Sequence, residues 1–486
     1  MTRLLPIEEE QPYAPIVTSV EPALRAAAEH AIDWLAEVDQ RPVAASRTPP
    51  ELRRRLDSPL PEYPSDPVSV IDDLVANVEG GLLGCAGGRF YGWVIGGAHP
   101  AALAADWLVS AWDQNATLAA CSPAEAVIEE IAGRWVIELL GLPDNSSFAF
   151  TSGCQLAHVT ALAAARRYLL LGCGHDPERE GLGNAPQLHV VTGTHGHHSV
   201  DRAVRILGLG SKHLHLVPTT ADRLDVPALE ALLTELEYAP VAVCLSAGDI
   251  NTGNFDDFRT VMPLCRLRGN TWVHVDGAFG LWAKVSPRFA HLLDGVEGAD
   301  SWATDAHKWL NTPFDIGFVA IRHREAHRAA MSIRAPYLTH AANARDQLDW
   351  TPEWSRRGRG VPVYAAVKAL GRRGIADIVE RCSDAAANLV EGIGSLPGTE
   401  VLSPAVINQG LVRFRDPTGA DHDGFTDRVI AAIQAEGTAW FGGTDWRGMR
   451  AMRISVCSWA TRSADVRKTV HAVERVLTAL LPGTAG

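Results

Sequence analysis

Two apolar segments that each lead to a charged side chain place the strongest constraint on the fold of this chain. The first, 271–275, has the composition of a buried strand and runs directly into Asp276. The second is strand-like and is predicted to end in a loop, 300–306, that leads to Lys308. Functional side chains of a parallel sheet gather where its strands end, so the sequence predicts that Asp276 and Lys308 share one site.

Strand-like and helix-like segments alternate along the middle of the chain, from residue 67 to about residue 370. The predicted strands are 148–151, 188–191, 241–245, 271–275 and 316–321, and the predicted helices include 122–140 and 155–170. Such alternation favours a mainly parallel sheet with helices on both faces, because parallel strands need long crossover connections. The chain is therefore predicted to be an α/β protein.

The N-terminal segments have a different character. Residues 1–20 are acidic and contain proline, which predicts an arm. Residues 21–40 show the apolar spacing of a helix, and residues 41–66 are rich in proline and arginine, which predicts an extended connector. We expect residues 1–75 to form an N-terminal arm with a helical segment.

The C-terminal part also differs from the middle of the chain. Strands are predicted near 410–414 and 452–456, and a final amphipathic helix is predicted to begin at Ser463, whose hydroxyl can cap it. We therefore expect a large domain over 76–375 and a small C-terminal domain over 376–486.

Composition argues against several classes of protein. The formal net charge of −13 disfavours nucleic acid or an anionic membrane surface as a partner. The 8 cysteines include no Cys-x-x-Cys pair, so neither a zinc knuckle nor a dithiol motif is indicated, and no metal is expected. We find no apolar segment of signal-peptide or membrane-spanning length, and we expect a cytoplasmic protein without a membrane partner.

A lysine and an upstream aspartate are the two side chains that an enzyme needs to hold and activate pyridoxal phosphate. The lysine amine condenses with the aldehyde of this cofactor as a Schiff base, and the aspartate keeps the pyridine nitrogen protonated, so that the ring accepts electrons. Each feature alone is ambiguous, since most His-Lys pairs lie on the surface and many strand-end aspartates only cap a turn. The interpretation therefore depends on the motifs that accompany Asp276 and Lys308.

Those motifs resemble the group II pyridoxal-phosphate-dependent decarboxylases, the family of the aromatic-amino-acid, histidine and glutamate decarboxylases. Val-Asp-Gly-Ala-Phe-Gly at 275–280 and Ala-Asp-Ser followed by His-Lys-Trp-Leu at 299–310 both occur at the family spacing. The resemblance extends from about residue 75 to the C-terminus. It implies the fold-type-I, aspartate-aminotransferase-like architecture with a small α+β C-terminal domain. It also implies pyridoxal 5'-phosphate as the cofactor, an amino acid as the substrate, and a homodimer with interfacial active sites.

The resemblance assigns a set of cofactor-binding residues. The turn after the strand 148–151 corresponds to the phosphate cup, where backbone N–H groups at a helix N-terminus suit an anion. His197 corresponds to the histidine that stacks on the pyridine ring, and a solvated histidine cluster or a metal site are its alternatives. Lys308, Asp276 and His197 are the expected catalytic residues. The further expected cofactor contacts are Gly153, Cys154, Gln155, Asp249, Ala278, Thr304 and His307.

Asp249 departs from the family, which has a threonine at this position. The carboxylate can contact the ring hydroxyl, contact the substrate amine or cap a turn, and the sequence leaves these three possibilities open.

The expected substrate contacts are Tyr91, Trp112, Trp350 and Arg359. Family decarboxylases carry a tyrosine on a mobile loop after the lysine, and this tyrosine protonates the carbanion that loss of CO2 leaves behind. No tyrosine occurs between Tyr337 and Tyr364. Trp350 lies near the expected place and cannot donate a phenolic proton. In relatives, loss of this tyrosine diverts the reaction to an aldehyde by decarboxylative oxidative deamination.

The sequence leaves several activities open. Decarboxylation is favoured by the resemblance, with oxidative deamination to an aldehyde as an extension of it. β-Elimination and retro-aldol cleavage use the same cofactor and are alternatives, because fold alone does not select the bond that breaks. A non-catalytic homologue that acts as a binding scaffold is the alternative of another class, and the intact lysine, aspartate and histidine argue against it.

Overall fold

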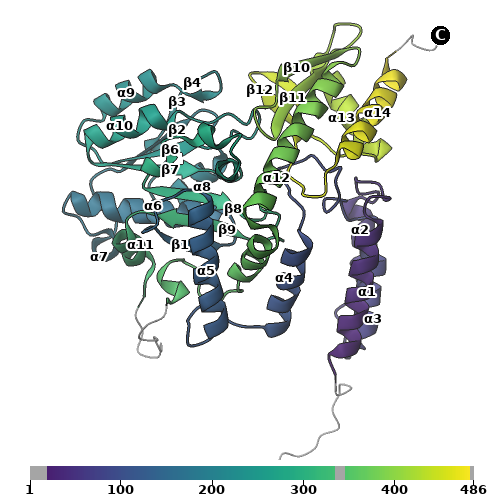
Figure 1. Ribbon diagram of the computed structural model, residues 1–486, viewed down its shortest axis with the longest axis horizontal. Coiled ribbons are helices and arrows are strands. Elements are labelled where there is room, and N and C mark those ends of the chain that lie inside the picture. Colours follow the sequence, from purple (N-terminus) through teal and green to yellow (C-terminus); the bar gives the residue numbers. More distant parts are fainter. Residues whose placement is uncertain (1–18, 334–344, 482–486) are drawn as a thin grey trace, which may run out of the picture.

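The structure, a computed structural model, describes residues 19–333 and 345–481. Its centre is a seven-stranded sheet with the strand order β1-β9-β8-β7-β6-β2-β3 (Figure 1). The strands are β1 (Ser147–Thr151), β2 (His189–Gly193), β3 (Leu214–Val217), β6 (Val241–Ser246), β7 (Thr271–Asp276), β8 (Ser301–Asp305) and β9 (Gly317–Ile321). The run from β3 to β8 is parallel, and β9 lies antiparallel between β8 and β1. The predicted, mainly parallel sheet of fold type I is confirmed.

The sheet is buried on both faces, which explains its apolar strands. In β6, Val241, Val243 and Leu245 belong to one core cluster, whereas Ala242 and Cys244 belong to the other. This alternation follows from the two-residue period of a strand. One core is covered by α6 (Cys154–Gly172), α8 (His198–Ile206) and α11 (Arg324–Met331), and the other by α5 (Pro123–Leu139), α9 (Val226–Glu235) and α10 (Phe258–Arg268).

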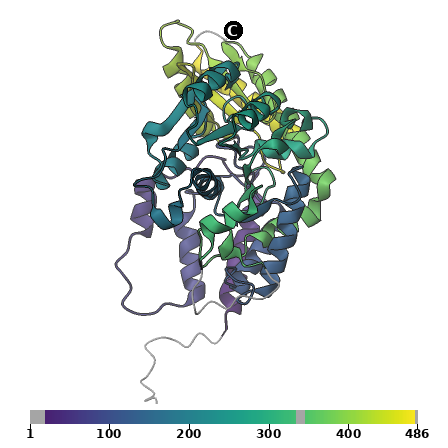
Figure 2. The ribbon, with the colours of Figure 1, turned by 90° about the vertical axis from the view of Figure 1, so that its left-hand side faces the viewer.

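A second, antiparallel sheet lies at one end of the molecule (Figure 2). It contains β10 (Thr399–Ser403), β11 (Gln409–Phe414), β13 (Met449–Ser455) and β12 (Gly442–Trp446), and it packs with α13 (His422–Glu436) and α14 (Ser463–Leu480). The helix α12 (Gly360–Gly394) connects this unit to the large sheet and bends at Gly371, where φ is 59°. The predicted border between residues 375 and 376 therefore falls inside α12, just beyond its bend.

The N-terminal helices extend from the body of the molecule (Figure 1). They are α1 (Glu21–Glu37), α2 (Pro49–Leu56) and α3 (Pro67–Val78), and α1 and α2 both pack on α3. The extended connector predicted for 41–66 is wrong over α2. Thr48 precedes this helix, and its backbone N–H donates to the Glu51 carboxylate at 2.7 Å, so a capping signal outweighs the prolines. Most of the predicted arm, 1–18, lies outside the described residues.

Two further local predictions are corrected by the structure. Residues 301–305 form β8 rather than a loop, and Lys308 lies in the turn that follows this strand. The final helix begins at Ser463 as predicted, but Arg462 is its N-cap, and the Arg462 backbone N–H donates to Asp465 at 2.9 Å.

The remaining elements are short connections, apart from one helix. They are α4 (Pro100–Trp112), α7 (Pro177–Glu180), β4 (Thr219–Thr220), β5 (Arg223–Leu224) and the 3-10 helices at Ser211–His213, Gly280–Val285, Ala290–Leu293, Val296–Gly298 and Gln347–Asp349. Within 19–333 and 345–481, no helix is both long and apolar enough to cross a membrane.

A buried ionic cluster attaches the segment after residue 344 to the large sheet. Glu129 of α5 lies 3.3 Å from an Arg345 nitrogen and 3.0 Å from an Arg356 nitrogen. The same two arginines donate to the carbonyl oxygens of Phe148 and Phe150 on β1. One carboxylate therefore neutralises two guanidinium groups that are largely removed from water.

We predict that Glu129→Gln lowers the free energy of unfolding by about 3–5 kcal/mol, because it leaves two buried cations without their counter-charge. The neighbouring substitution Glu130→Gln is the matched control. Its carboxylate is 45% exposed and lies 4.0 Å from Arg134, so we expect a change below about 1 kcal/mol. Denaturant unfolding of the three proteins measures both values, and equal losses for the two variants would contradict the role of the cluster.

Candidate active site

A cavity of about 290 Å³ lies at the edge of the large sheet where β1, β6, β7 and β8 end. These four strands run in the same direction, because β9 is antiparallel to both β8 and β1, so their C-terminal ends meet. Ser246, Asp276 and Asp305 are the last residues of β6, β7 and β8, and all three line the cavity. Eight predicted site residues also line it: Gly153, Cys154, Gln155, His197, Asp276, Ala278, His307 and Lys308.

Asp276 brings a carboxylate to the cavity wall. Only 13% of its side chain is exposed, and one of its oxygens accepts a hydrogen bond from the Ala278 backbone N–H at 3.1 Å. Burial by itself raises the pKa of Asp276, but His158 and then His197 and Lys308 oppose it, and the net effect is a pKa below the ordinary range. Asp276 is therefore ionised at neutral pH.

Lys308 brings an amine to the same cavity. Its Nζ lies 3.1 Å from a carboxylate oxygen of Asp305, three residues earlier at the end of β8. Burial lowers the pKa of Lys308, but the charges of Asp305 and Asp276 outweigh this, so the pKa lies above its ordinary value. The structure thus holds Lys308 as an ammonium group next to Asp305.

The N-terminus of α6 forms a third wall. Gly153 joins β1 to this helix with a φ of 138°, a conformation that suits glycine alone. The backbone of Gly317 on β9 lies directly against it, and a Cβ at Gly317 would come within 2.5 Å of Gly153. The 19-residue helix directs the positive end of its dipole toward the cavity, and the Cys154 N–H at its start already donates to the Asp305 carboxylate at 2.7 Å.

His197 is held by the start of α8. Its Nδ1 accepts a hydrogen bond from the Ser199 backbone N–H at 3.3 Å and lies 2.7 Å from the Ser199 hydroxyl. Burial lowers the pKa of His197 despite the charge of Asp276. We therefore assign a neutral ring with its proton on Nε2. The Gln155 side chain donates to the Ser199 carbonyl at 3.0 Å, which joins the starts of α6 and α8.

His307 is oriented by the turn that carries Lys308. Its Nδ1 accepts from the Ile316 backbone N–H at 3.1 Å, and its ring packs on Phe314 with the ring centres 4.4 Å apart. Burial lowers the pKa of His307, so this ring is also neutral near pH 7. Its Nε2 lies 3.7 Å from the Asp305 carboxylate.

Two predicted cofactor residues do not line the cavity. Asp249 accepts hydrogen bonds from the backbone N–H groups of Asn251 and Thr252, at 3.0 and 2.7 Å, and so caps its own turn. Among the possibilities left open for Asp249, the structure therefore shows the turn cap. The Thr304 hydroxyl donates to the Ala278 carbonyl at 3.4 Å and supports the wall behind the cavity.

The four predicted substrate residues also lie away from the cavity within the described chain. Tyr91 is fully buried against Phe441, and Trp112 is half exposed at the end of α4. Trp350 is buried between Arg324 and Arg345, and Arg359 is paired with Asp315 and Glu353. Their role in substrate binding stays a prediction.

Sequence reasoning missed several residues of the site, above all Asp305 and His158. Asp305 precedes Lys308 by three residues, so its place in the same motif was an available signal. His158 lies one helical turn after Cys154, on the same face of α6, but it is distant in sequence from its partner Asp276. His195, Ser246 and Phe279 also line the cavity and carried no distinct signal.

We predict that Asp305→Asn shifts the reaction of Lys308 with a small aldehyde to lower pH. Only the neutral amine attacks an aldehyde, and removal of the negative charge lowers the pKa of Lys308 toward its ordinary value. Reductive trapping followed by mass spectrometry of the Lys308 peptide measures the midpoint. Asp294→Asn, which breaks the exposed ion pair with Arg259, is the control. A midpoint unchanged or raised in Asp305→Asn would contradict the assignment.

The residues of the cavity fit pyridoxal phosphate. The glycine turn and the start of α6 suit its phosphate, since a side chain at Gly153 would fill this space. The ionised Asp276 suits a protonated ring nitrogen, and Lys308 supplies the amine that binds the aldehyde. The cavity volume lies near the lower end of the range for small-molecule sites, about 300–1,000 Å³.

Comparison with known proteins also indicates a pyridoxal-phosphate-dependent protein. The pyridoxal-dependent decarboxylase conserved domain matches residues 49–416. An aromatic-L-amino-acid decarboxylase of Bacillus atrophaeus is 28% identical over 394 residues, which cover 79% of each chain. A phenylacetaldehyde synthase of Petunia hybrida is 25% identical over 456 residues, 87% of each chain.

The fold has close structural counterparts. A crystal structure of Oryza sativa TDC with PLP and tryptamine superposes with a TM-score of 0.88 at 22% identity, and the match covers 94% of this chain and 97% of the other. The structural match shows the fold, and the match of the family model to residues 49–416 shows that the chain belongs to the pyridoxal-dependent decarboxylase family, with pyridoxal phosphate as its cofactor.

Proposed function

We propose that this protein is a pyridoxal-phosphate-dependent carboxy-lyase that removes CO2 from Cα of an amino acid. The observation that carries the proposal is that Lys308, Asp276 and the N-terminus of α6 all face one cavity. Bound pyridoxal phosphate supplies a ring that accepts the electrons left at Cα when a bond to it breaks. Membership of the decarboxylase family supports CO2 as the leaving group.

The side chains of the cavity have distinct roles in this proposal. Asp276 holds the proton on the ring nitrogen, and the start of α6 binds the phosphate. His197, with a neutral ring, confines one face of the cofactor. Lys308 would hold the aldehyde carbon of the cofactor, and its amine would be placed to move a proton at Cα of the substrate.

A second outcome, an aldehyde in place of an amine, is favoured by two observations. The segment between Tyr337 and Tyr364 contains no tyrosine, although part of it lies outside the described residues. One of the relatives named above is an aldehyde synthase. This route consumes one O2 and one water per amino acid and yields the aldehyde, CO2, ammonia and hydrogen peroxide. The same relatives do not favour β-elimination or retro-aldol cleavage, and the intact Lys308 and Asp276 do not favour a binding scaffold.

We predict that the purified protein releases CO2 from at least one member of a panel of amino acids, and that Lys308→Ala abolishes both this activity and the visible absorbance of the bound cofactor. Parallel assays of amine, aldehyde, ammonia and O2 uptake distinguish the two outcomes. Amine without O2 uptake indicates simple decarboxylation, whereas aldehyde with equimolar O2 uptake indicates the oxidative route. A protein that never binds the cofactor would end the proposal.

The same proposal includes the organisation and location of the chain. We propose the division into an N-terminal segment to residue 75, a large domain to 375 and a small domain beyond it, with α12 as the connection. We also propose a cytoplasmic location. It is supported by the 8 cysteines, which are all free thiols. Six of them are at least partly buried.

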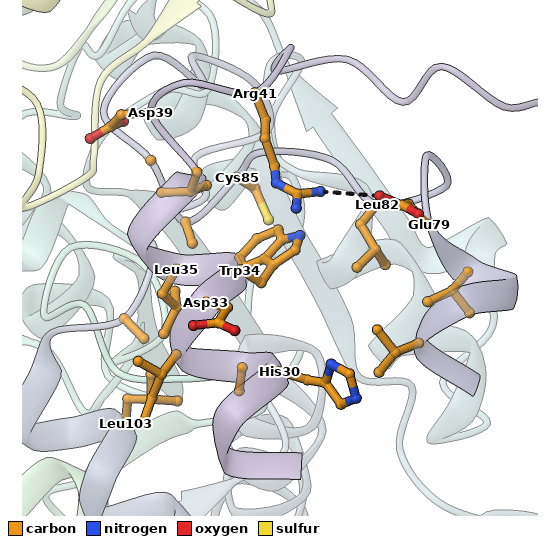
Figure 3. A pocket seen from close by; sticks show the side chains of 18 of the residues that line it. His30, Asp33, Trp34, Leu35, Asp39, Arg41, Glu79, Leu82, Cys85 and Leu103 are labelled. Carbon is orange, nitrogen blue, oxygen red and sulfur yellow. Dashed lines mark ion pairs between the residues drawn. The ribbon is translucent and has the colours of Figure 1, made fainter. Parts of the chain in front are cut away.

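We propose further that the protein is a homodimer. The helices α1, α2 and α3 contain no buried residue, which is unusual for amphipathic helices in a folded chain. Between α1, α3 and α4 lies a cavity of about 1,360 Å³ with a largely apolar lining. Figure 3 shows Trp34 and Leu35 of α1 at this cavity, with Leu82 across from them and the Arg41–Glu79 ion pair at its rim, 3.9 Å long.

Several large apolar side chains around this cavity are exposed, among them Ile32, Leu74 and Trp107. An apolar surface of this size marks an interaction site. A second copy of the chain is the occupant that we propose, because its own N-terminal helices carry the same uncovered apolar faces and a two-fold interface is self-complementary.

We predict that Leu74→Glu converts the dimer into a monomer, because it places a charge on the apolar face of α3. The control is Leu267→Glu on α10, which is 88% exposed and lies outside this surface, and which should stay dimeric. Analytical ultracentrifugation measures the mass of each protein. A monomeric wild-type protein, or a dimeric Leu74→Glu variant, would contradict this interface.

A further inference from the structure

A chain of buried polar side chains ends at the carboxylate of Asp276. The His158 Nε2 lies 3.5 Å from Asp276 Oδ2, and the His158 Nδ1 lies 2.9 Å from His274 Nε2. The His274 Nδ1 lies 2.8 Å from the Ser301 hydroxyl, to which the Trp272 indole N–H donates at 2.8 Å. The side chains behind Asp276 are fully buried, so solvent does not supply alternative partners.

The chemistry of the groups gives this chain a direction. Trp272 can only donate, so Ser301 accepts from it and its own proton is free to go to His274. Burial, followed by the nearby His158, lowers the pKa of His274 to about 3, so this ring is neutral and carries a single proton. With that proton on Nε2, His274 donates to His158, and His158 then presents an N–H to Asp276.

This arrangement leaves every proton of the chain with an acceptor. In the opposite arrangement of neutral rings, a lone pair of His158 would face the negative charge of Asp276, which is unfavourable in a buried site. A protonated His158 would also present an N–H to the carboxylate. In each favourable case the N–H faces Asp276. Among the described residues His158 Nε2 makes no hydrogen bond, and the Asp276 carboxylate 3.5 Å away is the charged group that it faces.

The position of His158 also matters for the local electrostatics. Asp276 lies at the end of a buried strand, where loss of solvent favours the neutral acid. His158 is the largest of the contributions that oppose this and lower the pKa of Asp276, ahead of His197 and Lys308. A carboxylate that stays ionised holds the proton on a pyridine nitrogen more strongly than a neutral acid does.

We infer that His158 is a positioning residue for Asp276: through the chain Trp272–Ser301–His274–His158, one N–H of His158 faces the carboxylate, keeps it negative and holds it in the orientation that a protonated ring nitrogen would need. This inference rests on the proposed function, because it concerns the ring nitrogen of pyridoxal phosphate. It assigns a role to four residues that the catalytic set of Lys308, Asp276 and His197 does not include.

The direct test is the protonation of the ring nitrogen in the holoenzyme. The enzyme is loaded with pyridoxal phosphate labelled with nitrogen-15 in the ring, and the nitrogen resonance is recorded by NMR at one pH near neutrality. In the wild-type enzyme we expect the resonance of a protonated nitrogen. In His158→Leu, which removes the donor, we expect a shift toward the unprotonated position.

Two further variants separate this role from a general effect on folding. His158→Gln restores an N–H that can reach Asp276, and its resonance should stay near that of the wild-type enzyme. His327→Gln is the matched control, because His327 is equally buried but bonds to Ser147 and to the Trp350 carbonyl, away from the cavity. We expect no shift in this variant.

A milder variant keeps the test decisive if His158→Leu does not fold. Ser301→Ala removes only the hydroxyl that donates to His274, and we expect a smaller shift in the same direction. A wild-type resonance in every folded variant, with cofactor bound, would overturn the inference and leave the proposed function intact. A wild-type protein that binds no pyridoxal phosphate would overturn both.

Discussion

The site depends on a negative charge that stays ionised inside the protein. Asp276 lies at the end of a central strand, where removal from water favours the neutral acid. Three groups on three different elements oppose this effect: His158 on α6, His197 at the start of α8 and Lys308 after β8. Because none of these elements is adjacent to β7 in sequence, the charge of Asp276 is a property of the assembled fold. Loss of any one of these three groups would therefore raise the pKa of Asp276.

The sheet explains how these groups reach one another. Parallel strands place their C-terminal ends at one edge, and the antiparallel β9 allows β1 to end at that same edge although it is the first strand in sequence. The close approach of Gly317 to Gly153 sets the path of the turn into α6. A side chain at either position would move the start of this helix and its N–H groups away from the cavity. Close packing in the sheet therefore determines where an anion can bind.

Much of the architecture was predictable because its signals are local. Continuous apolar runs identified β6, β7 and β9, and strand ends identified Asp276 and Lys308. Local signals were also misjudged: the prolines near 49 and 50 start α2 rather than prevent it, since proline suits the first turn of a helix. For Asp249 the sequence left several roles open, and the structure shows that one carboxylate oxygen accepts from the N–H groups of Asn251 and Thr252 in its own turn.

The sequence alone determined the kind of chemistry, since an amine, a carboxylate and an anion-binding turn can be recognised from short motifs and the strands that precede them. Only the tertiary structure decided how those groups are tuned. The direction of the chain through His274 and His158 and the absence of buried residues in α1 to α3 depend on contacts between distant segments or on the absence of such contacts. Such contacts depend on distance and burial in three dimensions, which the order of residues along the chain does not specify.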